Sequence, residues 1–347
     1  MKTYKNLWEK FISVENFELA ARRAVKSKKS KNAVRRFLKN KDRLLKKLRE
    51  KVIAGKFKTS VYKTFTVYEP KQRVIYKLPL YPDHVLHHAL INILGPIWQK
   101  MFIRDSFACI PGRGLHAASK RTMDFVRRNK FVLQCDIRKF YPSINHNKMM
   151  HIIARKIHDR RMLRILDEIV RSVGGEKNLP IGNLTSQWMG NVYMNELDRF
   201  VKQVLHWRDY IRYCDDFCLY GNDIHVIKRA AVKIRKFVER ELKMLFSHSV
   251  IHRTVNGISF VGYRHFKKFI LLRRAPAQKI KNRIFNVIQY DDFGEHGVGQ
   301  IAAAYGWSKW ACCYNWRNEC LACAKRKSER AYVFIRKKLL HDAINLN

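Results

Sequence analysis

Acidic residues are scarce in this sequence: 28 Asp and Glu stand against 71 Lys and Arg in 347 residues, a formal net charge of +43. The basic residues are spread along the whole chain and are not gathered in one tail. A folded surface with this excess repels itself unless a polyanion neutralises it. We therefore expect nucleic acid as the partner, with the aromatic residues (12%) able to stack on bases. The alternatives are a solvated basic surface and a surface that binds anionic membranes.

Long apolar runs are missing as well. No stretch approaches the roughly 18 apolar residues of a transmembrane helix, and the first ten residues lack the apolar core of a signal peptide. Hydrophobic residues still make up 47% of the chain, enough to fill a core, which excludes a fully disordered basic tail. There is no internal repeat and no low-complexity tract. We therefore expect a cytoplasmic protein of two or three packed units.

The eight cysteines fall into two groups. Four stand in apolar contexts and are expected to be reduced core residues: Cys109, Cys135, Cys214 and Cys218. The other four lie near the C-terminus: Cys312, Cys313, Cys320 and Cys323. Cys320 and Cys323 have the spacing of a zinc-ligand pair, but residues three apart also share one face of a helix. The sequence leaves both interpretations open and favours the helix.

The N-terminal part of the chain has a helical pattern followed by a strand pattern. Residues 1–56 are predicted to be helical and very basic, with a loop at 25–31 between two helices and a stop at Gly55. Residues 58–80 alternate and are rich in Val, Thr, Tyr and Phe, which predicts a hairpin with its turn at 69–72.

One carboxylate stands out in the next part of the chain. Asp83 is the expected N-cap of a buried helix, and residues 131–137 (FVLQCDI) read as a strand buried on both faces. Asp136 interrupts that strand, and a buried carboxylate costs several kcal/mol unless it is paired or metal-bound. The later elements are expected as helices over 145–173, 184–206 and 223–245, hairpins over 210–221 and 257–272, and helices from Pro276 onward.

Asp215 and Asp216 stand together at the predicted tip of the hairpin 210–221, between two short apolar segments. Two carboxylates this close repel each other unless a cation lies beside them. With Asp136 they make three hard oxygen donors, the kind that Mg²⁺ or Mn²⁺ prefers. Two such ions about 4 Å apart can activate a 3′-hydroxyl and stabilise a leaving pyrophosphate. The alternative is an Asp-Asp turn exposed to water, which is common in hairpins.

Several motifs agree with one protein family, in order along the chain from about residue 60 to 275. Residues 213–216 (YCDD) look like the YxDD motif of reverse transcriptases, and residues 135–144 (CDIRKFYPSI) resemble the palm motif that carries their other metal-binding Asp. Three further segments resemble the fingers hairpin, the fingers–palm stretch SFxxxPGRGxH and the primer grip: residues 68–75, 106–116 and 257–263. The sequence is thus similar to the group II intron-like lineage of bacterial reverse transcriptases.

Residues 179–187 (LPIGNLTSQ) narrow the resemblance to one group within the reverse transcriptases. Most reverse transcriptases have a QGxxxSP-like motif there, whereas the IGxxxSQ form resembles the reverse transcriptases of diversity-generating retroelements. The resemblance implies a nucleotidyltransferase that copies the element's template RNA into cDNA, with errors at template adenines, a process called mutagenic retrohoming. The alternatives are a retron- or phage-defence-type reverse transcriptase and a non-catalytic RNA-binding scaffold, although a scaffold has no use for three acids in a basic groove.

The resemblance also implies roles for individual residues. Asp136, Asp215 and Asp216 would hold two Mg²⁺ ions, with Mn²⁺ as a substitute, helped by the carbonyl of Ile137. Tyr141 would pack under the incoming sugar and reject a 2′-hydroxyl by steric exclusion. A core aromatic is the alternative for Tyr141.

Nucleotide contacts are implied at five further positions: Lys71, Arg73, Arg113, Ile181 and Gln187. Arg73, with Lys71, would neutralise the triphosphate, as cations do at transferring phosphoryl groups. Ile181 would lie against the templating base pair, where an aliphatic side chain cannot pair with polar edges and discrimination falls. His248 aligns with a Lys that related polymerases offer as a general acid, and a histidine could protonate pyrophosphate. Ordinary surface or core packing is the alternative for each.

The implied fold is α+β: a right-hand polymerase with fingers, a palm built on an antiparallel sheet and a short helical thumb. Its segments are a basic helical extension at 1–56, fingers at 57–130, a palm with fingers insertions and primer grip at 131–274, and the thumb at 275–347. The implied partners are template RNA, the RNA–cDNA hybrid, deoxynucleoside triphosphates and a small basic oligomeric protein, the accessory variability determinant. No membrane partner is expected.

Overall fold

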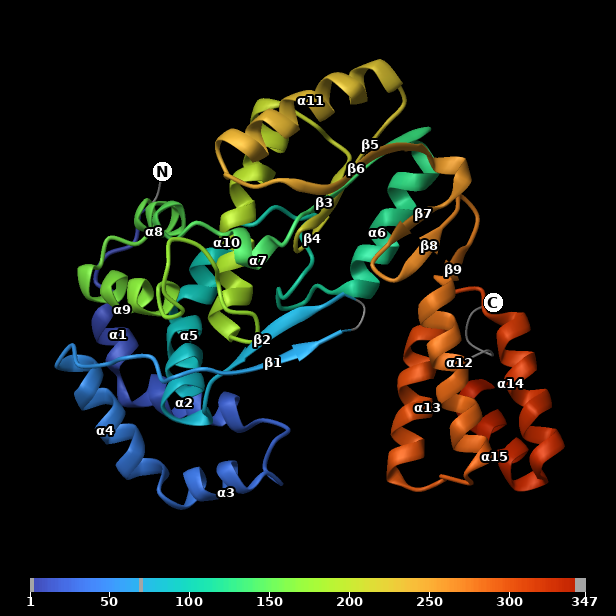
Figure 1. Cartoon of the computed structure of the whole chain (residues 1–347), viewed down its shortest axis with the longest axis horizontal. Helices are drawn as coiled ribbons and strands as arrows, with labels where there is room; N and C mark the ends of the chain where they lie inside the picture. The colour runs from blue at the N-terminus through green and yellow to red at the C-terminus, as the bar shows by residue number, and fades with distance from the viewer. Residues whose placement is uncertain (1–2, 69–70, 341–347) are drawn as a thin grey trace. The chain divides into compact units, whose positions relative to one another are not determined.

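The computed structural model describes residues 3–68 and 71–340, which form an α+β fold (Figure 1). Contacts divide the chain into two compact units. The first unit comprises Met1–Arg113, Gln134–Cys218 and Lys228–Val250. The second unit comprises Gly114–Leu133, Leu219–Ile227 and Ile251–Asn347. Each unit therefore brings together residues that are distant in the sequence.

Helices dominate the first unit. They are α1 (Trp8–Ile12), α2 (Val14–Val25), α3 (Asn32–Lys39), α4 (Lys41–Ile53), α5 (Val85–Gln99), α7 (Phe140–Ser143), α8 (His146–Ala154), α9 (Arg160–Val170), α10 (Leu184–Arg199) and most of α11 (Ile224–Arg240), whose residues up to Ile227 belong to the second unit. The N-terminal segment is helical as predicted, but it forms four helices where two were expected. Ser13 divides the first pair, because its backbone is extended and its side chain accepts a hydrogen bond from the N–H of Asn16. Gly55 follows α4 with φ +67°, which confirms the predicted stop.

A hairpin and a long helix follow. β1 (Lys63–Val67) and β2 (Arg73–Lys77) pair antiparallel as predicted, and residues 69 and 70 of the predicted turn lie outside the described residues. The prediction that Asp83 caps α5 is wrong. Its Oδ1 accepts a hydrogen bond from the Ser60 N–H at 3.0 Å, and α5 begins without a side-chain cap.

The largest sheet has four strands in the order β4-β5-β3-β6. They are β3 (Phe131–Ile137), β4 (Tyr210–Tyr213), β5 (Asp216–Gly221) and β6 (Phe246–Arg253). β3 coincides with the predicted buried strand. Only Cys214 and Asp215 join β4 to β5, so these strands form the predicted antiparallel hairpin. The helix expected over 223–245 ends earlier, at Arg240, and Lys243 adopts a left-handed φ of +55° before β6.

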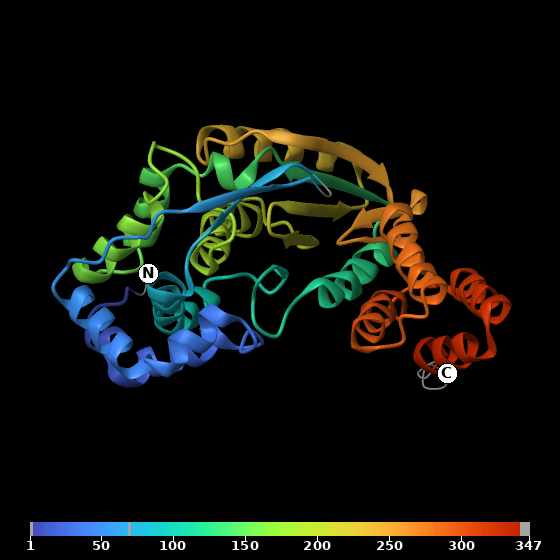
Figure 2. The ribbon, with the colours of Figure 1, turned by 60° about the horizontal axis from the view of Figure 1, so that its bottom comes forward.

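The second unit combines α6 (Leu115–Arg128) with a small sheet and a helical bundle. The predicted hairpin over 257–272 has a third strand, and all three are antiparallel: β7 (Ile258–Phe260), β8 (Tyr263–His265) and β9 (Ile270–Leu272). Figure 2 shows the bundle at the C-terminal end of the chain: α12 (Arg274–Gln289), α13 (Glu295–Ser308), α14 (Tyr314–Lys327) and α15 (Glu329–Leu340). Its core includes Ile284, Ile301 and Cys320. Within the described part of the chain, no helix is both long enough and apolar enough to span a bilayer.

Candidate functional site

The turn between β4 and β5 carries the paired acids. Cys214 occupies this turn with φ +59°, a left-handed conformation that is unfavourable for a residue with a side chain. Burial and the neighbouring Asp215 charge raise the pKa of the Cys214 thiol to about 12, so it is a neutral thiol at physiological pH. Because the turn conformation is costly, contacts outside the turn must hold it.

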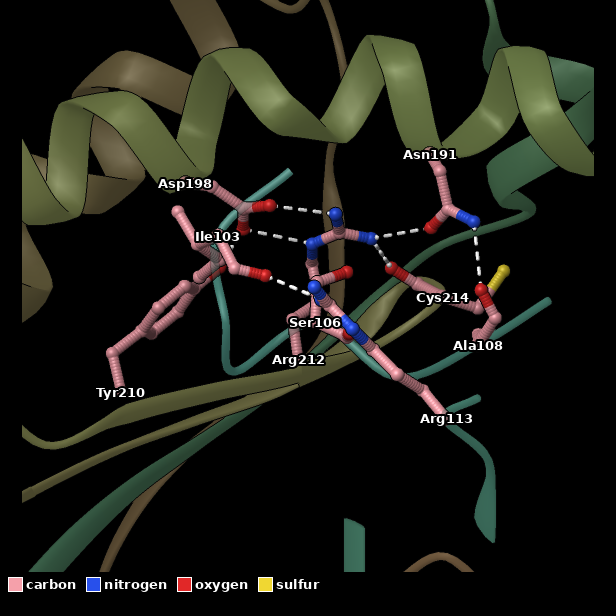
Figure 3. Close-up of polar contacts among 9 residues, drawn as sticks. All are labelled: Ile103, Ser106, Ala108, Arg113, Asn191, Asp198, Tyr210, Arg212 and Cys214. Atoms are coloured by element: carbon pink, nitrogen blue, oxygen red, sulfur yellow. Dashed lines mark hydrogen bonds and ion pairs between the residues drawn. The ribbon is translucent and has the colours of Figure 1, made fainter. Parts of the chain in front are cut away.

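A buried arginine provides those contacts (Figure 3). Arg212 is fully buried, and its Nε and Nη2 donate to the two carboxylate oxygens of Asp198 at 2.8 and 2.6 Å. Its Nη1 donates to the carbonyl of Cys214 at 2.9 Å and to Oδ1 of Asn191 at 3.0 Å. The Tyr210 hydroxyl also donates to Asp198, at 2.8 Å. The network therefore fastens the turn to α10, which carries both Asn191 and Asp198.

Sequence reasoning missed this network, although one signal was present. Arg212 stands between Ile211 and Tyr213 in one of the two short apolar segments of the predicted hairpin. A buried guanidinium requires a carboxylate partner, since an unpaired buried charge is prohibitively costly. The identity of that partner, Asp198, could not be read from the sequence because α10 and β4 meet only in the fold.

Arg113 braces its own loop, the segment between α5 and α6. Its Nη1 donates to the carbonyls of Ile103 and Ser106 at 2.6 and 2.8 Å (Figure 3). Burial lowers the pKa of Arg113, while the nearby Asp105 opposes that effect. The same loop pairs with β4 through the N–H of Arg212, which donates to the Asp105 carbonyl at 2.9 Å. These contacts give Arg113 a positioning role, and the nucleotide contact that the sequence suggested stays a prediction.

The carboxylates of Asp136 and Asp215 are near neighbours. The pKa of Asp215 is raised, first by burial and then by the negative charge of Asp136. Asp136 lies on β3, one residue before Ile137 ends that strand, and Asp215 lies in the turn. Two half-buried carboxylates that repel each other form a site that favours a bound cation.

Cations and a hydroxyl from other elements already face this pair. Lys71 Nζ lies 3.3 Å from Oδ2 of Asp136, and the Ser247 hydroxyl donates to the same oxygen. The positive charge of Arg73 lowers the pKa of Asp215, against the larger effect of burial. The hairpin therefore presents two basic residues to the carboxylates: Lys71, just before β2, and Arg73, the first residue of β2. Ser247 was not anticipated, because a lone serine in a basic segment carries no sequence signal.

The donor set fits a Mg²⁺ ion that the substrate helps to bind. Among residues 3–68 and 71–340, no three His, Cys, Asp or Glu side chains are grouped to hold a metal by themselves. Mg²⁺ commonly takes one or two carboxylates and completes its shell with water and substrate phosphates, and Asp136 with Asp215 offers that arrangement. Asp216 begins β5, and its charge contributes to the raised pKa of the buried Cys135 thiol on β3. Cys320, one of the two cysteines with the spacing of a zinc-ligand pair, is part of the bundle core.

Tyr141 lies against the turn. Its hydroxyl is 3.7 Å from the Cys214 sulfur, and burial raises the pKa of Tyr141. Its neighbour Phe140 is buried with 3% exposure, so the structure distinguishes the core aromatic from the one beside the site. Gly190 of α10 faces both rings, and a Cβ there would lie 3.3 Å from Tyr141 Cε1 and 3.1 Å from Phe140 Cε1. A glycine at this position lets the two rings approach the helix.

The segment around Ile181 is docked on β2. The carbonyl of Ile181 accepts a hydrogen bond from the Tyr76 N–H at 2.8 Å. Gly182 has φ +123°, and a Cβ there would come within 2.5 Å of the Tyr76 carbonyl oxygen, so only glycine fits. Ile181 is half-buried, and Gln187 is exposed in the first turn of α10. His248 is exposed on β6, next to Ser247.

The family model for reverse transcriptase (RNA-dependent DNA polymerase) matches residues 38–265. The chain belongs to the reverse transcriptase family. By family it is an RNA-directed DNA polymerase, and the paired acids, the hairpin β1–β2 and the docked segment around Ile181 all lie within the matched region.

Curated relatives of this reverse transcriptase are distant. It is 22% identical to protein YkfC of Escherichia coli over 272 residues, which cover 64% of this chain and 71% of YkfC. It is 25% identical to the group II intron-encoded protein LtrA of Lactococcus lactis over 135 residues, which cover 37% of this chain and 22% of LtrA. Among solved structures, telomerase from Candida albicans in complex with a fragment of telomeric RNA aligns with TM-score 0.47 and 10% identity, over 85% of this chain and 65% of that one. Apo telomerase from Candida tropicalis aligns over 61% of this chain and 55% of its own, with TM-score 0.44 and 12% identity.

Proposed function

We propose that this protein is the reverse transcriptase of a diversity-generating retroelement, which copies the element's template RNA into cDNA with errors concentrated at template adenines. The observation that carries the subtype is the segment 179–187, with Ile181 and Gln187 in the IGxxxSQ pattern. Its placement supports the proposal, because the Ile181 backbone is bonded to β2, the strand that presents Arg73 to Asp215. An accessory variability determinant is the proposed protein partner.

The site residues have proposed roles in binding the metal and the nucleotide. Asp136, Asp215 and Asp216, with the Ile137 carbonyl, would hold two Mg²⁺ ions, which when bound lower the pKa of a 3′-hydroxyl and offset charge on pyrophosphate. Lys71 is within reach of Asp136 in this structure, at 3.3 Å. Lys71 and Arg73 are therefore placed to bind a triphosphate that enters beside the carboxylates.

Two side chains, the aromatic Tyr141 and the aliphatic Ile181, would select the substrate. Tyr141 packs beside the turn, where its ring would exclude a 2′-hydroxyl from the sugar position. Ile181 offers only apolar surface to a base pair. A mismatched pair then leaves no buried polar group of the protein unsatisfied, so the energetic difference between correct and incorrect pairs is small. Gln187 and His248 are proposed to contact nucleotide and pyrophosphate.

Removing the carboxylates tests the polymerase site. Asp215→Asn and Asp216→Asn keep the side-chain size and remove the charge, and we expect each to abolish extension of a primed RNA template with Mg²⁺, with and without the accessory protein. The matched control is Glu239→Gln, which removes a half-exposed carboxylate from α11 and its pair with Arg235. Synthesis at the normal rate by the Asp variants would refute the site.

Changing Ile181 tests the subtype. Ile181→Gln places an amide beside the base pair, and we expect fewer substitutions opposite template adenines because a mismatch would then leave that amide unpaired. The measurement is deep sequencing of cDNA made from one template. Ile181→Val, which stays aliphatic, is the control and should keep the parental spectrum. An unchanged spectrum in Ile181→Gln would argue for an ordinary bacterial reverse transcriptase.

A further inference from the structure

The second unit contains a cavity of about 470 Å³ that lies outside the polymerase site described above. One wall is a single face of α6, with lining residues at helical spacing: His116, Ser119, Lys120, Met123, Asp124 and Arg127. The other walls are residues 268–270, at the start of β9, and residues 309–312, which follow α13. This volume falls in the range of small-ligand pockets.

Exposed aromatic rings form part of the cavity. The Trp310 indole stacks on the His116 imidazole, with centroids 4.8 Å apart and planes inclined by 24°. Trp310 is 43% exposed and Phe269 is 42% exposed, so both rings keep surface open to a ligand. Burial and the charge of Lys309 lower the pKa of His116, which keeps its ring neutral. Stacked and partly exposed rings of this kind are platforms for nucleic-acid bases.

The remaining lining groups are mostly cationic. Lys120, Arg127, Lys268 and Lys309 line the cavity, and Lys309 Nζ lies 5.7 Å from the Trp310 ring centroid. The one lining acid is Asp124, which pairs with Arg121 at 3.8 Å. Across the described ranges no carboxylate forms an ion pair with any of the three lysines. The cavity therefore combines a surface for a flat base with unneutralised charge for a phosphate.

Hydrogen bonds hold the three walls together. The α6 wall is joined to β8 by Ser119 Oγ and His265 Nε2, at 2.8 Å. The segment after α13 is joined to β9 by the Cys312 N–H, which donates to the Ile270 carbonyl at 2.7 Å. The platform is thus in place before a ligand arrives, which lowers the ordering cost of binding.

We propose that this cavity binds a nucleotide of single-stranded RNA, with the base on the Trp310–His116 pair and the phosphate among Lys120, Lys268 and Lys309. The proposal rests on the proposed function only in that the chain handles an RNA template. A free mononucleotide shares this chemistry. A strand is favoured because the rings stay about two-fifths exposed, whereas a pocket for a small molecule buries most of its ligand, and because the whole chain carries +43.

Photocrosslinking tests the contact directly in the full chain. Asp215→Asn protein is mixed with a single-stranded RNA that contains 4-thiouridine, irradiated and digested, and crosslinked peptides are identified by mass spectrometry. We expect crosslinks to Trp310 or His116, and an excess of ATP should not remove them. Crosslinks confined to other peptides would overturn the proposal, and loss of these crosslinks with ATP would assign the cavity to a free nucleotide.

Affinity measurements separate the base contact from the phosphate contact. Stacking on an aromatic ring contributes about 1–3 kcal/mol per base, so Trp310→Ala should weaken RNA binding roughly 5- to 150-fold. Tyr290→Ala removes an aromatic side chain of the same unit that is 74% exposed and outside the cavity, and it should bind normally. Lys268→Glu changes an exposed side chain and cannot disturb the core, so it serves if Trp310→Ala unfolds.

The outcomes distinguish this inference from the proposed function. Normal RNA affinity in both Trp310→Ala and Lys268→Glu would refute the cavity site even if the wild-type protein makes mutagenic cDNA. Conversely, an accurate polymerase whose Trp310→Ala variant binds RNA poorly would refute the retroelement assignment and leave the cavity site intact.

Discussion

The neighbours of His265 determine which of its ring nitrogens carries the proton and how its pKa is shifted. Its Nδ1 lies 3.1 Å from the Ile258 carbonyl, which can only accept a hydrogen bond, so Nδ1 carries the proton. Its Nε2 then accepts from the Ser119 hydroxyl. Burial lowers the pKa of His265 to about 4, and the bond to Ile258 only partly opposes this.

Acid should therefore destabilise the second unit through His265. The unfolded chain takes up a proton near pH 6.5 and the folded chain only near pH 4, so stability is fully present above pH 6.5 and is lost as the pH falls towards 4. Each pH unit costs about 1.4 kcal/mol, or about 2 kcal/mol between pH 6.5 and 5. We expect His265→Asn to lose this pH dependence of the free energy of unfolding, measured with urea. The variant His225→Asn, which changes an exposed histidine, should retain it. Equal slopes in the two variants would contradict the assignment.

Individual site residues were predicted from sequence to different degrees. Asp136 and Asp215 could be paired because a carboxylate in an apolar strand and a carboxylate in a turn each demand a cation. The contacts of Lys71 and Arg73 with them depend on where the hairpin β1–β2 lies, which came only from the family resemblance. Arg113 was assigned to the nucleotide from its motif, whereas its guanidinium bonds two carbonyls of its own loop.

At the scale of elements, the hairpin β4–β5 and helix α10 act as one part. Arg212 joins them through a fully buried ion pair with Asp198, with both side chains 0% exposed. The same guanidinium fixes the Cys214 carbonyl of the left-handed turn. Element boundaries were predictable where the pattern was long, as for β3. They were wrong where a side chain was used elsewhere in the fold, as for Asp83.

Removing Arg212 should separate these elements. Arg212→Ala leaves Asp198 buried without its partner, and breaking a buried pair from one side costs about 3–5 kcal/mol. We expect that loss in urea unfolding, together with reduced primer extension. Arg199→Ala, on the helix α10 that carries Asp198, removes a half-exposed arginine 4.0 Å from Glu196 and should cost about 1 kcal/mol or less. A similar small loss in both variants would mean that the turn holds its shape without the network.

For the whole molecule, the net charge and the α+β class were predictable from the sequence, whereas the segments that make up each unit were not. The excess of +43 needs no structure to indicate a polyanionic partner. Two compact units agree with the expected two or three, but the assembly of each unit from three separate segments was not predicted. It depends on contacts between distant segments, which leave no periodic pattern in the sequence.

RNA binding by the whole chain should depend steeply on salt. A protein that neutralises about six to ten phosphates loses roughly 10³- to 10⁵-fold in affinity between about 50 and 200 mM salt, because bound counterions are released on association. We expect this protein to follow that behaviour when RNA affinity is measured over a salt series. An affinity independent of salt would remove the electrostatic account of binding.

The interleaved segments also bear on how the polypeptide is made. A ribosome delivers Gly114–Leu133 before Lys228–Val250, yet the earlier stretch belongs to the second unit and the later one completes the first. Neither unit can close while translation is at mid-chain, and no single proteolytic cut releases one of them intact. The first unit has all of its segments only once Val250 has been made, and the second unit still waits for the residues that begin at Ile251.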